Sequence, residues 1–263
     1  MRDSLTGLLA AMLTAMTLFA FAGYQVTSES AATRLLGRLA ASLVELDRWV
    51  PAHREDVQLA ARDRPQDAVL VDDLPVDVVL PSPVVLEADD AALRDLLRTA
   101  MGRRLYHEGR GALQDEEGES HLPVTEPVRW TVSLLGSGMH GFWRIATLAS
   151  AIVTLALVAS LVMRRRSPLP ALLGGAIGAA VASFFVWLVA GAGNSLFDSS
   201  VDREIMLILR DGAWLGLRNA LGVAVMALAV MYLWRTLVEP RREHAKTYWP
   251  DLEGSDVYPS DPN

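Results

Sequence analysis

Residues 145–166 read IATLASAIVTLALVASLVMRRR, an uncharged apolar run that ends in three consecutive arginines. A helix needs about 20 mostly apolar residues to cross the hydrocarbon layer of a bilayer, and this run has that length. Because arginine is enriched on the cytoplasmic side of membrane spans, Arg164, Arg165 and Arg166 also indicate which end of the helix faces the cytoplasm. This stretch therefore predicts a membrane protein and begins to fix its orientation.

Three other stretches of the chain have the composition of membrane spans. No charge interrupts residues 4–28 or 167–197, and Arg218 is the only charge between Asp211 and Arg235. The sequence thus predicts a multi-pass α-helical membrane protein with four transmembrane helices. We expect the spans at residues 5–26, 144–163, 169–191 and 213–234.

Basic residues near the span ends give one consistent orientation. The fourth span is followed by Arg235, Arg241, Arg242 and Lys246, whereas the connection between the third and fourth spans is mainly acidic. Since short basic segments stay in the cytoplasm, we expect both termini to be cytoplasmic. Residues 28–142 would then lie outside, on a protein of the plasma membrane.

The first span, within residues 1–27, has a second interpretation. Ala20-Phe21-Ala22 has the small-x-small form of a signal-peptide cleavage site. The apolar stretch is longer than a usual signal core and Arg2 is offset by Asp3, which favours an uncleaved anchor. The chain contains no cysteine, so a lipoprotein anchor and disulfide bridges are excluded.

Residues 28–142 are predicted to form a small α+β extracytoplasmic domain. Leucines recur every three or four positions from Ala31 to Val50, which predicts an amphipathic helix that continues from the first span and is ended by Pro51. Asp89 or the next residue is placed to cap a second helix that runs to about Met101, because an aspartate oxygen can accept the free amide hydrogens of a first helical turn.

Strands and loops are predicted for the remainder of this domain. Residues 68–71 and 76–86 are rich in β-branched residues, and the prolines in the second run favour an edge strand or an extended segment. We expect an exposed loop at residues 107–123 and a last strand-like run at residues 128–135. The Asp- and Pro-rich residues 237–263 are predicted to be a disordered cytoplasmic tail.

Small residues define helix faces that can approach closely within a membrane, where the hydrophobic effect gives no drive for association. The third and fourth spans both carry such faces at four-residue spacing. We interpret them as packing contacts inside a three-helix unit at residues 143–236, with a homo-oligomer or a protein partner as the alternative. The packing residues predicted are Gly174, Gly175, Gly178, Ala182, Gly216 and Ala220.

Charged residues around the start of the fourth span are the best candidates for a binding site: Asp198, Asp202, Glu204, Asp211 and Arg218. Glu204, Asp211 and Arg218 are seven residues apart, so on a continuous helix they lie along nearly one line. An ionisable residue within a membrane is costly and often functional. Arg218 also has a structural interpretation, because its guanidinium can reach the interface and pair with Asp211.

Motifs for metals, cofactors and reactions do not outweigh structural explanations. Residues 136–141 match the pattern GxGxxG, but they lead directly into a span and no acidic residue follows about 20 positions later, so a flexible hinge is favoured over a dinucleotide site. His53, His107, His121 and His140 lack the spacing of a zinc site. We therefore expect no cofactor, no metal and no catalytic residue.

Charge excludes one class of partner. Residues 29–144 contain 20 acidic and 13 basic residues, and the whole chain has a net charge of −7. Such a surface gives no electrostatic footprint for nucleic acid. We expect a non-enzymatic accessory, assembly or sensing component of the cell envelope that contacts the lipid bilayer and a protein partner. The alternative is a small transporter subunit or membrane-embedded enzyme that uses the charged connection before the fourth span.

Overall fold

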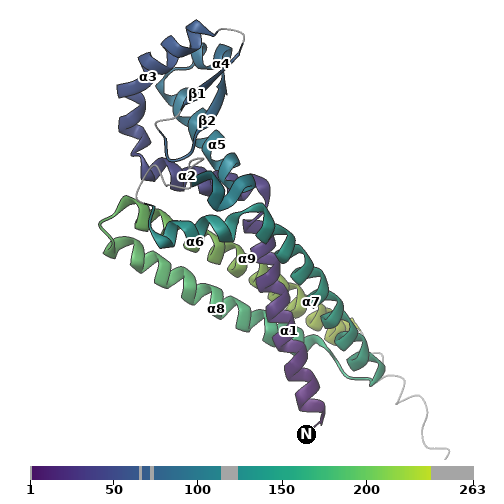
Figure 1. Ribbon diagram of the computed structural model, residues 1–263. Coiled ribbons are helices and arrows are strands. Elements are labelled where there is room, and N and C mark those ends of the chain that lie inside the picture. The colour runs from purple at the N-terminus through teal and green to yellow at the C-terminus, as the bar shows by residue number, and fades with distance from the viewer. Residues whose placement is uncertain (1, 65–66, 72–73, 114–123, 238–263) are drawn as a thin grey trace, which may run out of the picture.

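The structure is a computed structural model that describes residues 2–64, 67–71, 74–113 and 124–237. In this part of the chain, four helices are long and apolar enough to cross a membrane, which confirms the four predicted candidate spans. They are α1 (Arg2–Val26), α7 (Ser137–Met163), α8 (Leu169–Leu196) and α9 (Ser200–Leu237). Figure 1 shows them as a bundle beneath a smaller domain. We call these four helices the membrane bundle.

Two of these helices extend well beyond the spans predicted from charge. The helix α7 begins at Ser137 rather than residue 144, and α9 begins at Ser200 rather than residue 213. Charged residues mark where a membrane ends, but they do not end a helix. At 1.5 Å per residue, the 38 residues of α9 span about 57 Å. This is nearly twice the ~30 Å hydrocarbon layer, so α9 also reaches into the domain beside the bundle.

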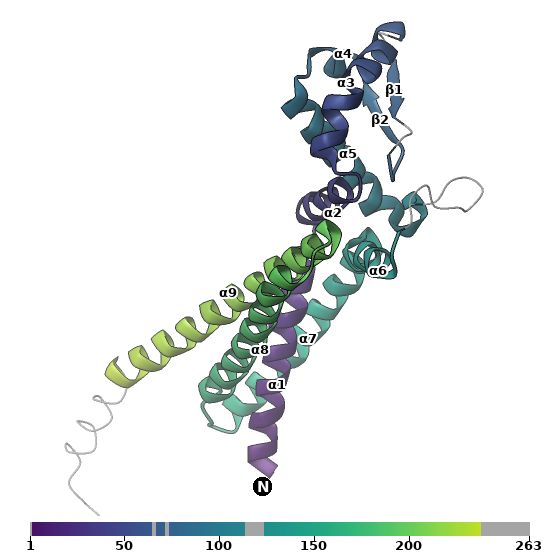
Figure 2. The same ribbon diagram turned by 90° about the vertical axis from the view of Figure 1, so that its left-hand side faces the viewer.

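The first helix is an integral part of the bundle. It contacts α7, α8 and α9, while α8 and α9 form an antiparallel pair with the most extensive contact of all. Small residues allow close approach: a side chain on Gly23 of α1 would collide with the indole ring of Trp143, from α7. Figure 2 shows the C-terminal half of α9 diverging from the other three helices, and residues 228–236 are accordingly exposed on almost every side.

The domain beside the bundle comprises residues 29–135, and we call it the head domain. Its helices are α2 (Glu29–Leu43), α3 (Leu46–Asp63), α4 (Ser82–Glu87), α5 (Asp90–Glu108), the 3-10 helix η1 (Gly109–Leu113) and α6 (Glu126–Leu135). The strands β1 (Ala68–Val71) and β2 (Val78–Pro81) form one antiparallel pair in which Val69 lies opposite Leu80. The prediction of strands between the first and later spans is therefore confirmed, with the second strand shorter than expected.

The helix predicted over residues 31–50 is wrong in its boundaries. The chain bends after α1 at Thr27 and Ser28, so α2 does not continue the first span. A second break follows at Glu45, which adopts a left-handed conformation with φ of 48°. Pro51 lies inside α3 instead of ending a helix. The left-handed residue, which has no clear sequence signal, is the physical reason for the break.

Residues 128–135 form the helix α6 and not a strand. Val128, Val132 and Leu135 are buried, and their spacing of four and three residues is helical. The predicted hinge at residues 136–141 is also wrong, because only Gly136 separates α6 from α7. The glycines favour a flexible loop, but the helical preference of the segments on either side prevails, so residues 137–141 are helical.

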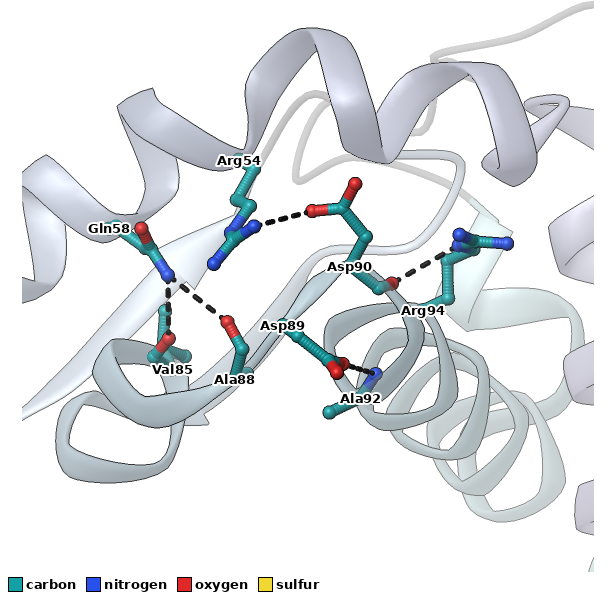
Figure 3. Close-up of polar contacts among 8 residues, drawn as sticks. All are labelled: Arg54, Gln58, Val85, Ala88, Asp89, Asp90, Ala92 and Arg94. Carbon is teal, nitrogen blue, oxygen red and sulfur yellow. Dashed lines mark hydrogen bonds and ion pairs between the residues drawn. The ribbon is translucent and has the colours of Figure 1, made fainter.

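The helix predicted from Asp89 exists and is longer than expected. Asp89 is its N-cap, and its carboxylate accepts a hydrogen bond of 2.7 Å from the Ala92 amide (Figure 3). The helix α5 continues to Glu108 and ends at Gly109, whose φ of 62° favours glycine. The loop predicted at residues 107–123 is thus helical as far as residue 113, and its residues 114–123 lie outside the described part, like the tail at 238–263.

Polar contacts join α3 to the turn before α5. Arg54 donates a hydrogen bond of 2.8 Å to the Asp90 carboxylate, and the Gln58 amide donates to the carbonyls of Val85 and Ala88 (Figure 3). The Val85 carbonyl also accepts a hydrogen bond of 3.3 Å from the Ala88 amide, so the end of the short helix α4 is held from both sides. These contacts fix α3 and α5 on either side of the turn.

The core of the head domain lies between α2, α3, α5, α6 and the strands. Its largest fully buried side chains include Leu36, Leu93, Leu97 and Met101. The crossing of α2 and α5 is especially close, because a side chain on Gly102 would lie 2.1 Å from the backbone oxygen of Thr33. Leu93, Leu97 and Met101 are four residues apart, so they form one buried stripe along α5.

Candidate functional site

The acidic residues predicted on the fourth span meet an arginine from the head domain. Arg38 lies on α2, and its guanidinium reaches across to α9, where it contacts both Glu204 and Asp211. These two acids are seven residues apart and lie on one face of the helix, as the sequence predicted for a continuous helix. We call the three residues the Arg38 bridge.

The two halves of the Arg38 bridge differ in geometry. Arg38 Nη2 lies 2.7 Å from Glu204 Oε1, but no N–H is aligned with that oxygen, so this contact is an ion pair without a hydrogen bond. Arg38 Nη1 donates a hydrogen bond of 3.2 Å to Asp211 Oδ2. The side chains of Glu204, Arg38 and Asp211 are 15%, 35% and 52% exposed. Because Glu204 is the most buried, its attraction to Arg38 is the least screened by water and salt.

Apolar contacts surround the Arg38 bridge. Ile208 of α9 is buried in the head-domain core, and Val201 and Ile205 pack against the same core. The first turns of α9, as far as Ile208, therefore pack on the head domain, while Gly216, Ala220 and Ala224 farther along the helix pack in the membrane bundle. One helix thus connects the two regions through both charge and packing.

A cleft of about 820 Å³ opens beside the Arg38 bridge, between the head domain and the α8–α9 turn. Five arginines and four acidic residues line it. The arginines are Arg38, Arg48, Arg94, Arg98 and Arg203. All but Arg203 contact a carboxylate, and Arg203 donates instead to the backbone oxygen of Asp198 at 3.5 Å. The charges of this cleft are therefore largely balanced within the protein.

The other predicted binding residues do not join the cleft. Asp198 is exposed between α8 and α9. Asp202 lies in the first turn of α9, where its backbone amide donates a hydrogen bond of 3.4 Å to the Ser199 hydroxyl. Arg218 is exposed on α9 and forms no ion pair with Asp211 or with another residue in the described ranges. The structure thus joins Glu204 and Asp211 through Arg38 and leaves Asp198, Asp202 and Arg218 apart.

Arg38 is the residue that sequence reasoning missed. The leucine spacing of this segment placed it on the water-facing side of a helix, and nothing local indicated a partner more than 160 residues later. Only the seven-residue spacing of the acids on α9 gave a signal that a cation should lie opposite them.

The predicted packing residues divide into two groups. Gly175 is buried against α1, where an added Cβ would lie 2.4 Å from the Ala11 backbone oxygen, and Gly216 and Ala220 are buried as well. Gly178 has no atom of the described residues within 4 Å of an added Cβ, and Gly174 and Ala182 are likewise exposed. One small-residue stripe of α8 therefore packs inside the bundle, and the other faces outward.

His53 and His107, the histidines of the head domain that the structure describes, do not come together, and His121 lies outside the described residues. His53 stacks on Trp49, and His107 Nε2 lies 3.4 Å from the Glu29 carboxylate. Burial of the neighbouring Tyr106, and secondarily the Glu29 charge, raise the pKa of its phenol. No group of three histidine or acidic residues is placed to hold a metal ion in the ranges that the structure describes.

The outward face of the sheet is apolar. Ala68, Leu70, Val79 and Pro81 point away from the core and are exposed, and they form two directly paired positions, Ala68 with Pro81 and Leu70 with Val79. A sheet with one face in water usually alternates apolar inward and polar outward residues. We call these four residues the sheet face. It lies toward the end of the head domain farthest from the membrane bundle (Figures 1 and 2).

Comparison of the chain with models of protein families, with curated proteins and with solved structures found no match. The function is therefore argued from the geometry described above.

Proposed function

We propose that this chain is a non-enzymatic accessory, assembly or sensing component of the plasma membrane, in which the head domain contacts a partner and α9 relays that contact to the membrane bundle. The observation that carries the proposal is that the first turns of α9 pack on the head-domain core, through Ile208 and the Arg38 bridge. A head domain that was only tethered to the membrane by a linker would not need to share a helix with the membrane bundle.

The orientation in this proposal rests on charge. Arg164, Arg165 and Arg166 follow α7, and Arg235 lies in the last turn of α9, both at the end of the bundle opposite the head domain. The positive-inside rule therefore favours a head domain outside the cell and cytoplasmic termini. The contacts of α1 with the other three helices support its retention as an uncleaved span.

The sheet face is the proposed contact surface for a partner protein. Four exposed apolar side chains on a water-facing sheet are unfavourable for an isolated domain, whereas a protein partner would bury them. Both strands also lie at sheet edges in the described structure, so a partner strand could add to either side. Their distance from the bundle leaves this surface accessible above a membrane (Figure 1).

The test compares charge substitutions on and off the sheet face. Leu70→Glu and Val79→Glu place a carboxylate on the sheet face, and Leu59→Glu places one at an equally exposed apolar position of α3. Membranes of the native cell are solubilised in mild detergent, and the mass of the purified particle is measured by native mass spectrometry. We expect the wild type and Leu59→Glu to carry a stoichiometric partner and the two sheet-face variants to lose it. A wild type that is a clean monomer contradicts the proposal.

The alternative of a transporter subunit or membrane enzyme gains no support from the geometry. That function requires Arg218 to share a polar entrance with the acids, but Arg218 does not line the cleft that contains Glu204. Four of the five cleft arginines are also paired with carboxylates of the protein itself, which leaves little net charge to attract a substrate.

A further inference from the structure

The helix α6 occupies an unusual place between the head domain and the membrane bundle. It lies crosswise to the bundle, in the plane of Figure 1 and end-on in Figure 2, and only Gly136 separates it from α7. Its inner face packs Val128, Val132 and Leu135 into the head-domain core. Because one side of α6 is buried in this core, the direction of its opposite side is fixed relative to the head domain.

That outer face is apolar. Trp130 is 60% exposed and Leu134 is 42% exposed, although both are large apolar side chains. At 100° per residue they lie about 40° apart and roughly 150° around the helix from the buried face. Among the described residues nothing buries these two side chains, so the outer face is open to an occupant.

The lipid bilayer is the occupant that the position of α6 favours. The helix α7 continues directly into the candidate span, and its early residues Phe142 and Ile145 are exposed where lipid would surround them. Phe142 is five residues beyond Ser137, which places α6 about 8 Å farther from the bilayer centre. This is the depth of the headgroup layer, where tryptophan is enriched because its ring is apolar and its N–H is polar.

Basic residues at the same level fit phosphate headgroups. Arg129 of α6 forms an ion pair of 3.6 Å with Glu126, and Arg110 donates hydrogen bonds to the Arg129 backbone oxygen and to the Ser133 hydroxyl. Arg144 is exposed near the start of α7. Glu126 is the one acidic residue of α6. A helix that lies in the interface plane, with apolar side chains toward the acyl chains and cations at the headgroups, is an established mode of membrane contact.

We propose that α6 is an interfacial helix that rests in the phospholipid headgroup layer, with Trp130 and Leu134 inserted toward the acyl chains. It would fix the height and tilt of the head domain above the bilayer. A covering protein is the outcome that the experiment must exclude.

The absence of cysteine from the chain allows single-site labelling without background substitutions. Trp130→Cys and Leu134→Cys are each labelled with a nitroxide, and the full-length protein is reconstituted in vesicles of phosphatidylcholine and phosphatidylglycerol. Ile145→Cys serves as the lipid-exposed control and Leu59→Cys as the water-exposed control of the head domain. Collision rates with oxygen, which concentrates in lipid, and with a water-soluble nickel chelate are measured by electron paramagnetic resonance.

We expect labels at 130 and 134 to collide with oxygen severalfold more often than with the nickel chelate, as at 145, and label 59 to show the reverse. Labels at 130 and 134 that match label 59 would overturn the inference. So would labels that neither reagent reaches, because these would indicate a protein cover. If Trp130→Cys fails to fold, Leu134→Cys alone decides, with its melting temperature compared with the wild type.

Discussion

The head domain and the membrane bundle bury opposite kinds of side chain. In the head domain the fully buried residues are large, with Leu36, Leu97 and Met101 among them. In the bundle the buried residues are mostly small, such as Ala176 and Ala220, and the large apolar residues face outward. The two regions share the continuous helix α9, yet one buries large side chains and the other buries small ones.

The inversion follows from the two solvents. Water drives large apolar side chains to the interior, because each buried leucine or methionine contributes about 1.5–3 kcal/mol. Lipid tails are as apolar as leucine and give no such drive, so close contact between backbones decides which helix faces meet. A substitution should therefore have opposite consequences in the two regions, and four experiments test this difference.

The largest effect is expected from a leucine truncation in the head domain. Leu97→Ala removes a side chain that is fully buried and should lower the free energy of unfolding by about 2–5 kcal/mol. The matched variant Leu155→Ala removes a leucine that is 69% exposed on α7 and should change stability little. Thermal unfolding in detergent measures both. Equal losses would show that the bundle has a hidden apolar core.

The second experiment adds a methyl group in the membrane bundle, whereas the first removed a side chain from the head domain. Gly175→Ala directs a methyl group against the Ala11 backbone oxygen at 2.4 Å and should destabilise the bundle by about 1–3 kcal/mol. Gly178→Ala, one turn away in the outward stripe, meets open space and should leave stability unchanged or slightly raised. The melting temperatures of the two variants give the answer. A loss at Gly178 would instead indicate a homo-oligomer through the outward stripe.

The third effect concerns the junction of the two regions. A double-mutant cycle with Arg38→Ala and Glu204→Ala should give a coupling energy of about 1 kcal/mol, because this pair is partly buried. The same cycle on Arg48 and Glu45, which are both exposed, should give a value near zero. A coupling energy near zero for both pairs would show that the Arg38 bridge does not connect the head domain to α9, and that only the apolar contacts around Ile208 do so.

The smallest effect is expected at Arg218. Arg218→Gln should change insertion and stability by no more than about 0.5 kcal/mol, because the side chain is exposed and forms no ion pair with Asp211. The neighbouring variant Asn219→Ala removes a hydrogen bond of 2.7 Å to Gln25 of α1 and should cost about 0.6 kcal/mol. A greater loss at Arg218 than at Asn219 would revive the transport alternative.

The same contrast explains what the sequence could predict. The four spans follow from the distances between charges, and Asp89 from the local chemistry of a helix cap, so both could be predicted. The break at Glu45 and the helix α6 could not, because they depend on how neighbouring elements pack around a short segment. In the candidate site the acids were predicted as one stripe on a helix. Their partner Arg38 was not, since contacts between distant segments leave no local pattern.

The unbroken length of α9 has a consequence for how force passes through the protein. Its backbone runs without a proline from Ser200 to Leu237, so every turn is tied to the next by hydrogen bonds. Torsion applied near Ile208 therefore reaches Leu237, about 44 Å away along the axis, without any part of the helix unwinding. A twist that begins in the head domain is thereby transmitted to the last turn of α9, at the far end of the same helix.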